Sequence, residues 1–172
     1  MYANSGDFYP KLLIERPYLH TVLALLITHW RVPHFYAMHR FLHPWRLKNF
    51  PDIGRFMYKH IHSLHHKSYN PTTLSGTSFH PVESMMYYSA CFLVAPFSVH
   101  ITIPVGCIID CGIGAWLGHD GFMAPGVGDQ FHQLHHESFD CNYGAQHVPL
   151  DWLFGTYAEK DSDVPKIWRA SR

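Results

Sequence analysis

The chain has 172 residues, within the usual size of one domain, and its 13 Lys and Arg residues balance its 13 Asp and Glu residues. This balance excludes a strongly basic surface for nucleic acid and an acidic tail of the solvating kind. Charged residues make up only 15% of the sequence, against about 25% in a typical soluble domain, whereas histidine occurs 16 times. We therefore expect one functional domain over residues 1–172, with no nucleic-acid partner.

The first apolar stretch runs from Tyr18 to Trp30. The residues before it mix acidic and basic charges, and no small-residue cleavage site follows it, so we predict no cleaved signal peptide. Alone it is short for the roughly 20 residues of a membrane-spanning helix. A helix that continues towards Met38 would reach that length, although Pro33 would kink it. We expect a helix embedded in the membrane.

The second apolar block covers residues 84–118, carries almost no charge except Asp110, and is interrupted by Pro96 and Pro104. At 1.5 Å per residue it is about long enough for two minimal membrane passes. We predict a transmembrane helical hairpin, the alternative being a buried core hairpin of a soluble α-domain. Either hairpin returns the chain to its starting face and places His119 beside the residues that precede the block.

Short turn motifs separate these blocks from the polar segments. Pro51-Asp52, Asn70-Pro71 and Pro125-Gly126 predict turns, each followed by a helix start. Pro81 suits a first helical turn, where Glu83 would complement the helix dipole.

The four cysteines lack the CxxC spacing of zinc or redox motifs. Cys107 and Cys111 are four residues apart, so they could share a helix face as metal ligands. We favour small, reduced and buried side chains as their interpretation.

Histidine clusters are the main feature of the polar segments: one HxxxH motif and two HxxHH motifs, which flank the apolar block. On a helix these spacings fall on one face, so each cluster is expected to project its imidazoles to one side. A set of nine ligands exceeds what one metal ion can use, and imidazole suits several transition metals, so we predict two ions. The candidate ligands are His39, His43, His62, His65, His66, His119, His132, His135 and His136.

Several common catalytic motifs are absent from the sequence, and their absence limits the reactions that we expect. The sequence has no HExxH, no GxSxG and no phosphate-binding glycine loop, so hydrolysis lacks its usual machinery. Redox metals beside an apolar hairpin favour activation of dioxygen against a C–H bond of a lipid. Two other hypotheses stay open. The first is a protein that stores, senses or transports a metal without catalysis, in which Asp110 and His100 are the candidates to line a transport path through the hairpin. The second is a metal-dependent hydrolase with Glu137 as the general base.

The same motifs resemble a known family. HxxxH, HxxHH, an apolar hairpin and a second HxxHH, in this order, resemble the fatty acid hydroxylase and sterol desaturase superfamily, over about residues 30–157. The stretches at 119–121 and 140–144 look most like the sterol C5-desaturase and C4-methyl oxidase branch, with fatty-acid hydroxylation as the alternative.

The resemblance implies an all-α, membrane-embedded helical bundle with a histidine-lined di-metal site at the cytosolic face. It further implies two iron ions, for which zinc can substitute in a purified sample, and an oxidoreductase that hydroxylates or desaturates a sterol or fatty acyl lipid. The expected partners are membrane lipid and a cytochrome b5-type electron donor. The expected location is the endoplasmic reticulum membrane, multi-pass, or the inner membrane of a bacterium.

Three further residues are candidates for supporting roles. His80 is either a tenth ligand, a partner of a ligand, or only a helix cap. Asp120 and Asn142 lie beside the clusters, and side chains such as these commonly orient ligating imidazoles through the second ring nitrogen. Asp140 and Asp151 share that possibility, with a purely structural role as the alternative.

Overall fold

Helices form nearly all of the regular structure in the computed structural model, which describes residues 15–46, 50–93, 100–124 and 127–163. One antiparallel ladder joins β1 (Met123–Ala124) to β2 (Val127–Gly128). Because all other described elements are helical and these strands have two residues each, the predicted all-α class is confirmed. The predicted turn at Pro125-Gly126, the centre of the hairpin at 94–99 and the N-terminal segment lie outside the described residues. The α-helices and the 3-10 helices (η) are α2 (Pro17–Leu42), α3 (Ile53–His60), η1 (His62–Lys67), η2 (Thr73–Thr77), α4 (Pro81–Tyr88), η3 (Ser89–Phe92), α5 (Thr102–Leu117), α6 (Asp129–Ser138), α7 (Leu150–Leu153) and η4 (Asp161–Asp163).

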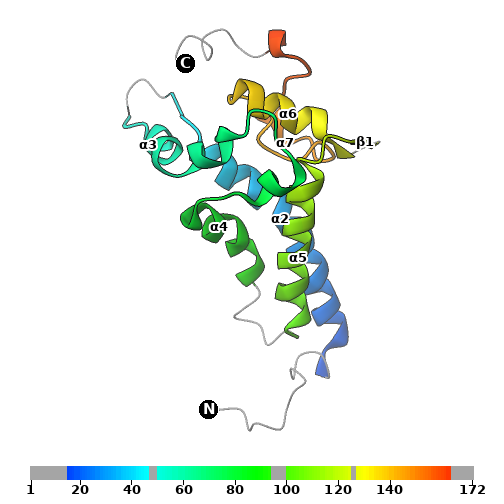
Figure 1. Cartoon of the computed structure of the whole chain (residues 1–172). Helices are drawn as coiled ribbons and strands as arrows, with labels where there is room; N and C mark the ends of the chain where they lie inside the picture. The colour runs from blue at the N-terminus through cyan, green and yellow to red at the C-terminus, as the bar shows by residue number, and fades with distance from the viewer. Residues whose placement is uncertain (1–14, 47–49, 94–99, 125–126, 164–172) are drawn as a thin grey trace.

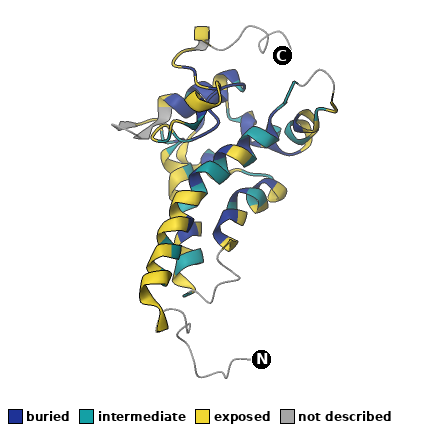
Figure 2. Cartoon of the chain, turned by 180° about the vertical axis from the view of Figure 1, so that it is seen from behind, coloured by how far each residue is buried: buried dark blue, intermediate teal, exposed yellow. Residues whose placement is uncertain are grey.

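Helix α2 is the longest element and continues through Pro33, as the sequence allowed. Proline at the first turn suits its start, because the missing N–H would have no helical partner there. Its first half is largely exposed and its second half turns Tyr36, His39 and Leu42 into the interior. Figure 2 shows this change of burial along one helix. The second half of α2 therefore belongs to the site and the first half projects away from it.

The predicted hairpin has two helical arms. The first is α4 continued by η3 and the second is α5, and they meet through Cys91 and Cys107, with Ile27 of α2 against both. In Figure 1 the lower parts of α2 and α5 lie side by side as a leg below the rest of the molecule. Among the described residues, none of the helices combines the length and the apolar character needed to cross a bilayer.

Two aspartates, Asp52 and Asp151, fix the backbone near the upper end of α2. Asp52 caps α3, accepting from the Arg55 N–H at 2.9 Å, and also accepts from the Trp45 N–H at 2.8 Å. Asp151 accepts from the N–H groups of Tyr143 and Gly144, both at 2.7 Å. Each carboxylate satisfies several backbone donors that have no helical partner. Asp52 thereby ties the end of α2 to the start of α3, and Asp151 ties α7 to the loop at Tyr143 and Gly144, near the upper end of α2 in Figure 1.

Candidate metal centre

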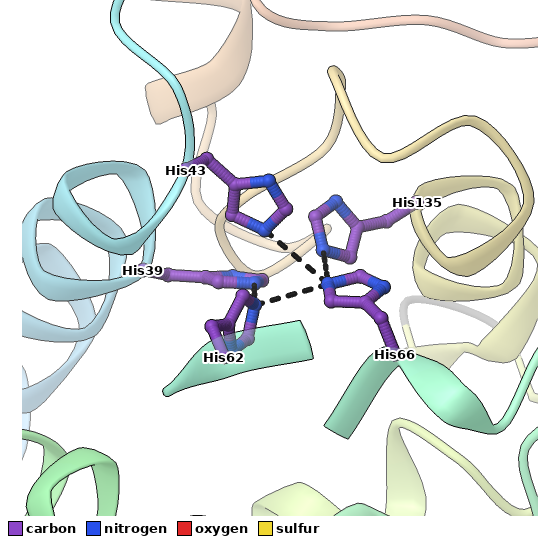
Figure 3. A group of neighbouring side chains, drawn as sticks. All are labelled: His39, His43, His62, His66 and His135. Atoms are coloured by element: carbon purple, nitrogen blue, oxygen red, sulfur yellow. Dashed lines mark hydrogen bonds between the residues drawn. The ribbon is translucent and has the colours of Figure 1, made fainter. Parts of the chain in front are cut away.

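All nine histidines predicted as ligands lie at the junction of α2, η1, α5 and α6, in two groups. Within each group, one ligand atom from every residue lies within 4.8 Å of the others. We refer to them as group A and group B. Group A, which Figure 3 shows, contains His39, His43, His62, His66 and His135. Group B contains His65, His119, His132 and His136.

Each of the two HxxHH motifs contributes histidines to both groups, a division that the spacing did not predict. In η1, His62 and His66 belong to group A and His65 to group B. In α6 the division is reversed: His135 belongs to group A, and His132 and His136 to group B. The i, i+4 pair of each motif faces one centre and the i+3 residue faces the other, so each motif bridges the two groups.

Backbone carbonyls fix the orientation of several rings. The Nδ1 atoms of His39 and His135 lie 2.7 and 2.6 Å from the carbonyl oxygens of Tyr143 and Cys141. The Nδ1 of His119 lies 2.6 Å from the Ala115 oxygen. A carbonyl can only accept, so Nδ1 carries the proton in these rings and Nε2 keeps a free lone pair. This is the tautomer that a metal ligand bonded through Nε2 requires.

The free lone pairs converge. The Nδ1 of His136 donates to the Ser68 carbonyl oxygen, 3.0 Å away, just as the Nδ1 of His119 donates to the Ala115 oxygen. The Nε2 atoms of these two rings are nevertheless only 3.1 Å apart. Two Nε2 atoms without protons cannot hydrogen-bond to each other. In group A, the Nε2 of His66 lies within 3.0 to 3.3 Å of three other Nε2 atoms (Figure 3). A cation between these atoms would remove the repulsion, so the donor set fits a metal ion in each group.

Burial keeps these imidazoles neutral. Removal from water lowers the pKa of His136 to about 3 and that of His119 to about 4, from 6.5. Burial is also the largest cause that lowers the pKa of His62 and His135, and neighbouring imidazoles lower it further. Neutral imidazole is the form that binds metal, so the groups are ready to ligate at neutral pH.

Glu83 contacts one of the histidines, whereas the sequence predicted only that it complements the dipole of the helix that starts at Pro81. Its side chain is fully buried, and its Oε1 lies at hydrogen-bond distance, 2.7 Å, from Nδ1 of His62. Burial raises the pKa of Glu83 to about 8. The available signal was an acidic residue at the very start of an almost uncharged block, where a buried carboxyl needs a partner.

Asn142 and Asp151 shape the loop that receives the rings. Asn142 is fully buried and donates to the carbonyl oxygens of Phe131 and Ala158 at 3.0 and 2.9 Å. Asp151 holds the Tyr143 N–H, and the Tyr143 carbonyl in turn accepts from His39. Both residues therefore act on the site through the backbone.

The other supporting candidates lie outside both groups. The ring of His80 accepts the Val82 N–H at 3.2 Å and so caps α4. Asp120 accepts the Phe122 N–H at 2.9 Å. His29, which lies outside the predicted motifs, is hydrogen-bonded through Nδ1 to the Leu25 carbonyl of its own helix.

A cavity of about 290 Å³ opens beside the histidines, near the lower end of the usual range for ligand sites. His39 of group A and three members of group B border it, and its walls are mostly apolar and aromatic. Its far end contains an ion pair, with Arg31 Nε 2.7 Å from an oxygen of Asp110. The apolar residues on its walls include Phe35, Phe79, Tyr87, Ile113 and Leu117.

The fold and the site together define a helical protein with two adjoining polyhistidine centres beside an apolar cavity. The model of the family described as "Fatty acid hydroxylase" matches residues 21–156. The chain therefore belongs to the fatty acid hydroxylase family, as its motifs predicted.

The relatives include a sterol branch. The chain is 31% identical to the Delta(7)-sterol-C5(6)-desaturase of Nicotiana tabacum, over 77% of this chain and 48% of that protein. It is 27% identical to lathosterol oxidase of Rattus norvegicus, over 94% and 52%. It is also 27% identical to sphinganine C4-monooxygenase 1 of Arabidopsis thaliana, over 90% and 59%. The chain thus spans about half the length of such relatives. No solved structure matches it significantly.

Proposed function

We propose that this chain is a membrane-bound, non-haem di-iron oxygenase that desaturates or hydroxylates a lipid, with a sterol as the substrate class. The observation that carries the proposal is the pair of histidine groups whose unprotonated Nε2 atoms converge beside an apolar cavity. The family membership and the names of the sterol-acting relatives support it.

In this proposal the nine histidines hold two iron ions, one in group A and one in group B. Bound iron supplies the redox capacity to activate dioxygen against an unreactive C–H bond, which side chains lack. The residues of the chain keep the imidazoles neutral, direct Nε2 inwards and limit water at the site. Glu83 and the carbonyl oxygens of Tyr143, Cys141 and Ala115 perform the orienting part. Electrons would come from a cytochrome b5-type donor.

The cavity is the proposed substrate site. Its apolar wall suits a hydrocarbon skeleton, and the Arg31–Asp110 pair offers a polar contact for a lipid that carries a hydroxyl group. Arg31 precedes His39 by eight residues on α2, which is about 12 Å along the helix. A lipid in the cavity would thus contact the ion pair at one end and approach the histidine groups at the other.

We also propose that the leg formed by α2 and α5 lies in the membrane, in the endoplasmic reticulum of a eukaryote or the inner membrane of a bacterium. Large apolar side chains are exposed along it: Leu26 is 59% exposed and Ile109 is 57% exposed. Figure 2 shows the exposed surface along this part. Lipid contact would cover side chains that water solvates poorly, and the histidine groups would lie at the aqueous, cytosolic face.

Lipid profiling tests the proposal. The full chain is expressed in a host that lacks its own sterol C5-desaturase, beside His65→Ala and His135→Ala variants at matched expression. We expect an oxygen-dependent desaturated or hydroxylated lipid with the native chain and none with either variant. Identical lipid profiles for the native chain and both variants would contradict the proposed function.

A further inference from the structure

A second set of metal-binding atoms lies away from the histidine groups, between the arms of the hairpin. The Sγ atoms of Cys91, Cys107 and Cys111 all lie within 4.8 Å of one another. Cys91 comes from η3 and the other two come from α5, one turn apart. Cys91 and Cys107 are buried and Cys111 is partly buried. The fold therefore brings together three sulfur atoms from two separate segments.

Their spacing is closer than ordinary packing gives. The Sγ atoms of Cys91 and Cys107 are 2.7 Å apart, whereas nonbonded carbon atoms, which are smaller than sulfur, pack best at about 3.5 to 4.0 Å. The Cys111 sulfur is 3.9 Å from that of Cys91. A disulfide would explain two of these sulfurs and leave the third without a role. A cation bound by all three sulfurs at about 2.3 Å would hold them roughly 4 Å apart, as Cys91 and Cys111 already are, and binding would move the Cys91 and Cys107 sulfurs apart by roughly 1 Å.

We propose that Cys91, Cys107 and Cys111 bind one thiophilic d10 cation, of the Cu(I) or Zn(II) class, in a three-thiolate site separate from groups A and B. Thiolate sulfur selects such soft cations over the harder ions that prefer oxygen ligands. Binding forms three metal–sulfur bonds and releases three thiol protons to the solvent, and no electrons are transferred. Arg31 lines the same cavity as Cys111 and offsets part of the negative charge of the site.

The position of the site indicates its purpose. Cys91 and Cys107 belong to the apolar cluster that joins the first arm, the second arm and Ile27 of α2. A cation bound there would link both arms of the hairpin and hold them against α2. Because Cys111 also borders the cavity, the site would fix part of the cavity wall. The proposal does not depend on the oxygenase function.

The test is metal analysis of the purified full chain in detergent after incubation with Zn(II) or with Cu(I), followed by X-ray absorption at the edge of the added metal. We expect one sulfur-ligated ion per chain, with metal–sulfur distances of about 2.3 Å for zinc. Cys91→Ala and Cys107→Ala should each remove this ion. Cys141→Ala is the matched control, since its side chain packs with Leu134 and Ala158 instead, and it should keep the ion.

Wild-type protein alone provides a second measurement if a variant fails to fold. Zn(II) should slow alkylation of Cys91 and Cys107 at least tenfold, and Mg(II) should not. Coordination by nitrogen only, with no protection of these thiols, would overturn the proposal. A Cys91–Cys107 disulfide in peptides of the freshly purified protein, prepared without reductant, would overturn it as well.

Discussion

The division of each HxxHH motif between the two groups makes neighbouring histidines separable by mutation. His132 and His135 share α6, but His132 belongs to group B and His135 to group A. We predict that His132→Ala weakens metal binding in group B and that His135→Ala weakens it in group A, because each group loses one of its imidazoles. Metal titration of the purified variants measures both affinities.

The control for these variants is His29→Ala. His29 is exposed, and within the described residues its ring hydrogen-bonds the Leu25 carbonyl of the same helix. Its metal affinity should equal that of the native chain. If His132→Ala and His135→Ala weakened the same metal ion, the assignment to two groups would be incorrect.

Glu83 allows a test of orientation without loss of a ligand. We predict that Glu83→Ala lowers metal affinity by about 10- to 100-fold, as is typical when the partner of a ligating histidine is removed. Glu83→Gln should retain most of the affinity, since its amide oxygen can still accept from Nδ1 of His62. Isothermal titration with zinc compares the two variants, and equal affinities for Glu83→Ala and the native chain would show that this contact does not position His62.

The sequence predicted which histidines gather, but not how they divide. The spaced motifs identified eight of them, and His119 was predicted because it follows the apolar block, which returns the chain to its starting face. The division is the same in η1, a 3-10 helix, and in α6, an α-helix, so it depends on how the two motifs face each other in the fold, which the spacing within one motif does not specify. Glu83 was missed because its partner, His62, is distant in the sequence.

Among the secondary-structure elements, the contact of η2 with α5 depends on one glycine. A Cβ atom at Gly76 would overlap the Ala115 carbonyl and come within 2.9 Å of the His119 Nδ1. We predict that Gly76→Ala moves the end of α5 and with it His119, so group B loses metal affinity while group A retains it. Metal titration checks this outcome, and Gly106→Ala is the control, because a Cβ there meets no atom within 4 Å.

Element types and boundaries were only partly predictable. The start of α3 after Asp52 and the position of Pro81 in the first turn of α4 follow from local rules, whereas a helix through Pro33 was only one possibility that the sequence left open. The β1–β2 ladder did not, since two residues per strand give no periodic pattern. The short, 3-10 continuation of α4 as η3 was equally invisible, because a buried apolar run looks the same in either helix type.

For the whole molecule, the buried histidines predict a dependence of stability on pH in the metal-free chain. The pKa values of His136 and His119 are about 3 and about 4 when folded, below the ordinary 6.5. The unfolded chain therefore binds protons first as the pH falls below 6.5, and the stability present above that pH is lost towards pH 3 to 4. Thermal unfolding between pH 7 and 4 measures this, and a midpoint that does not fall would contradict the lowered pKa values.

The arrangement of the chain in the membrane makes a further prediction. If the leg of α2 and α5 lies in the bilayer, cysteines introduced near His62 and near His132 should react with an impermeant reagent from the same side of sealed vesicles. An exposed position such as Lys59, replaced by cysteine, serves as the probe near His62, and Gln133 serves near His132. Labelling from opposite sides would exclude this topology.

Iron content coupled to oxygen-dependent turnover is the measurement on which the proposed function rests most heavily. The full chain, loaded with iron and supplied with an electron donor, should contain two iron ions bound by nitrogen ligands and convert a sterol substrate only when dioxygen is present. A folded, iron-replete sample with one iron ion or none, or with product formation that does not require dioxygen, would show that the two histidine groups do not form a di-iron oxygenase.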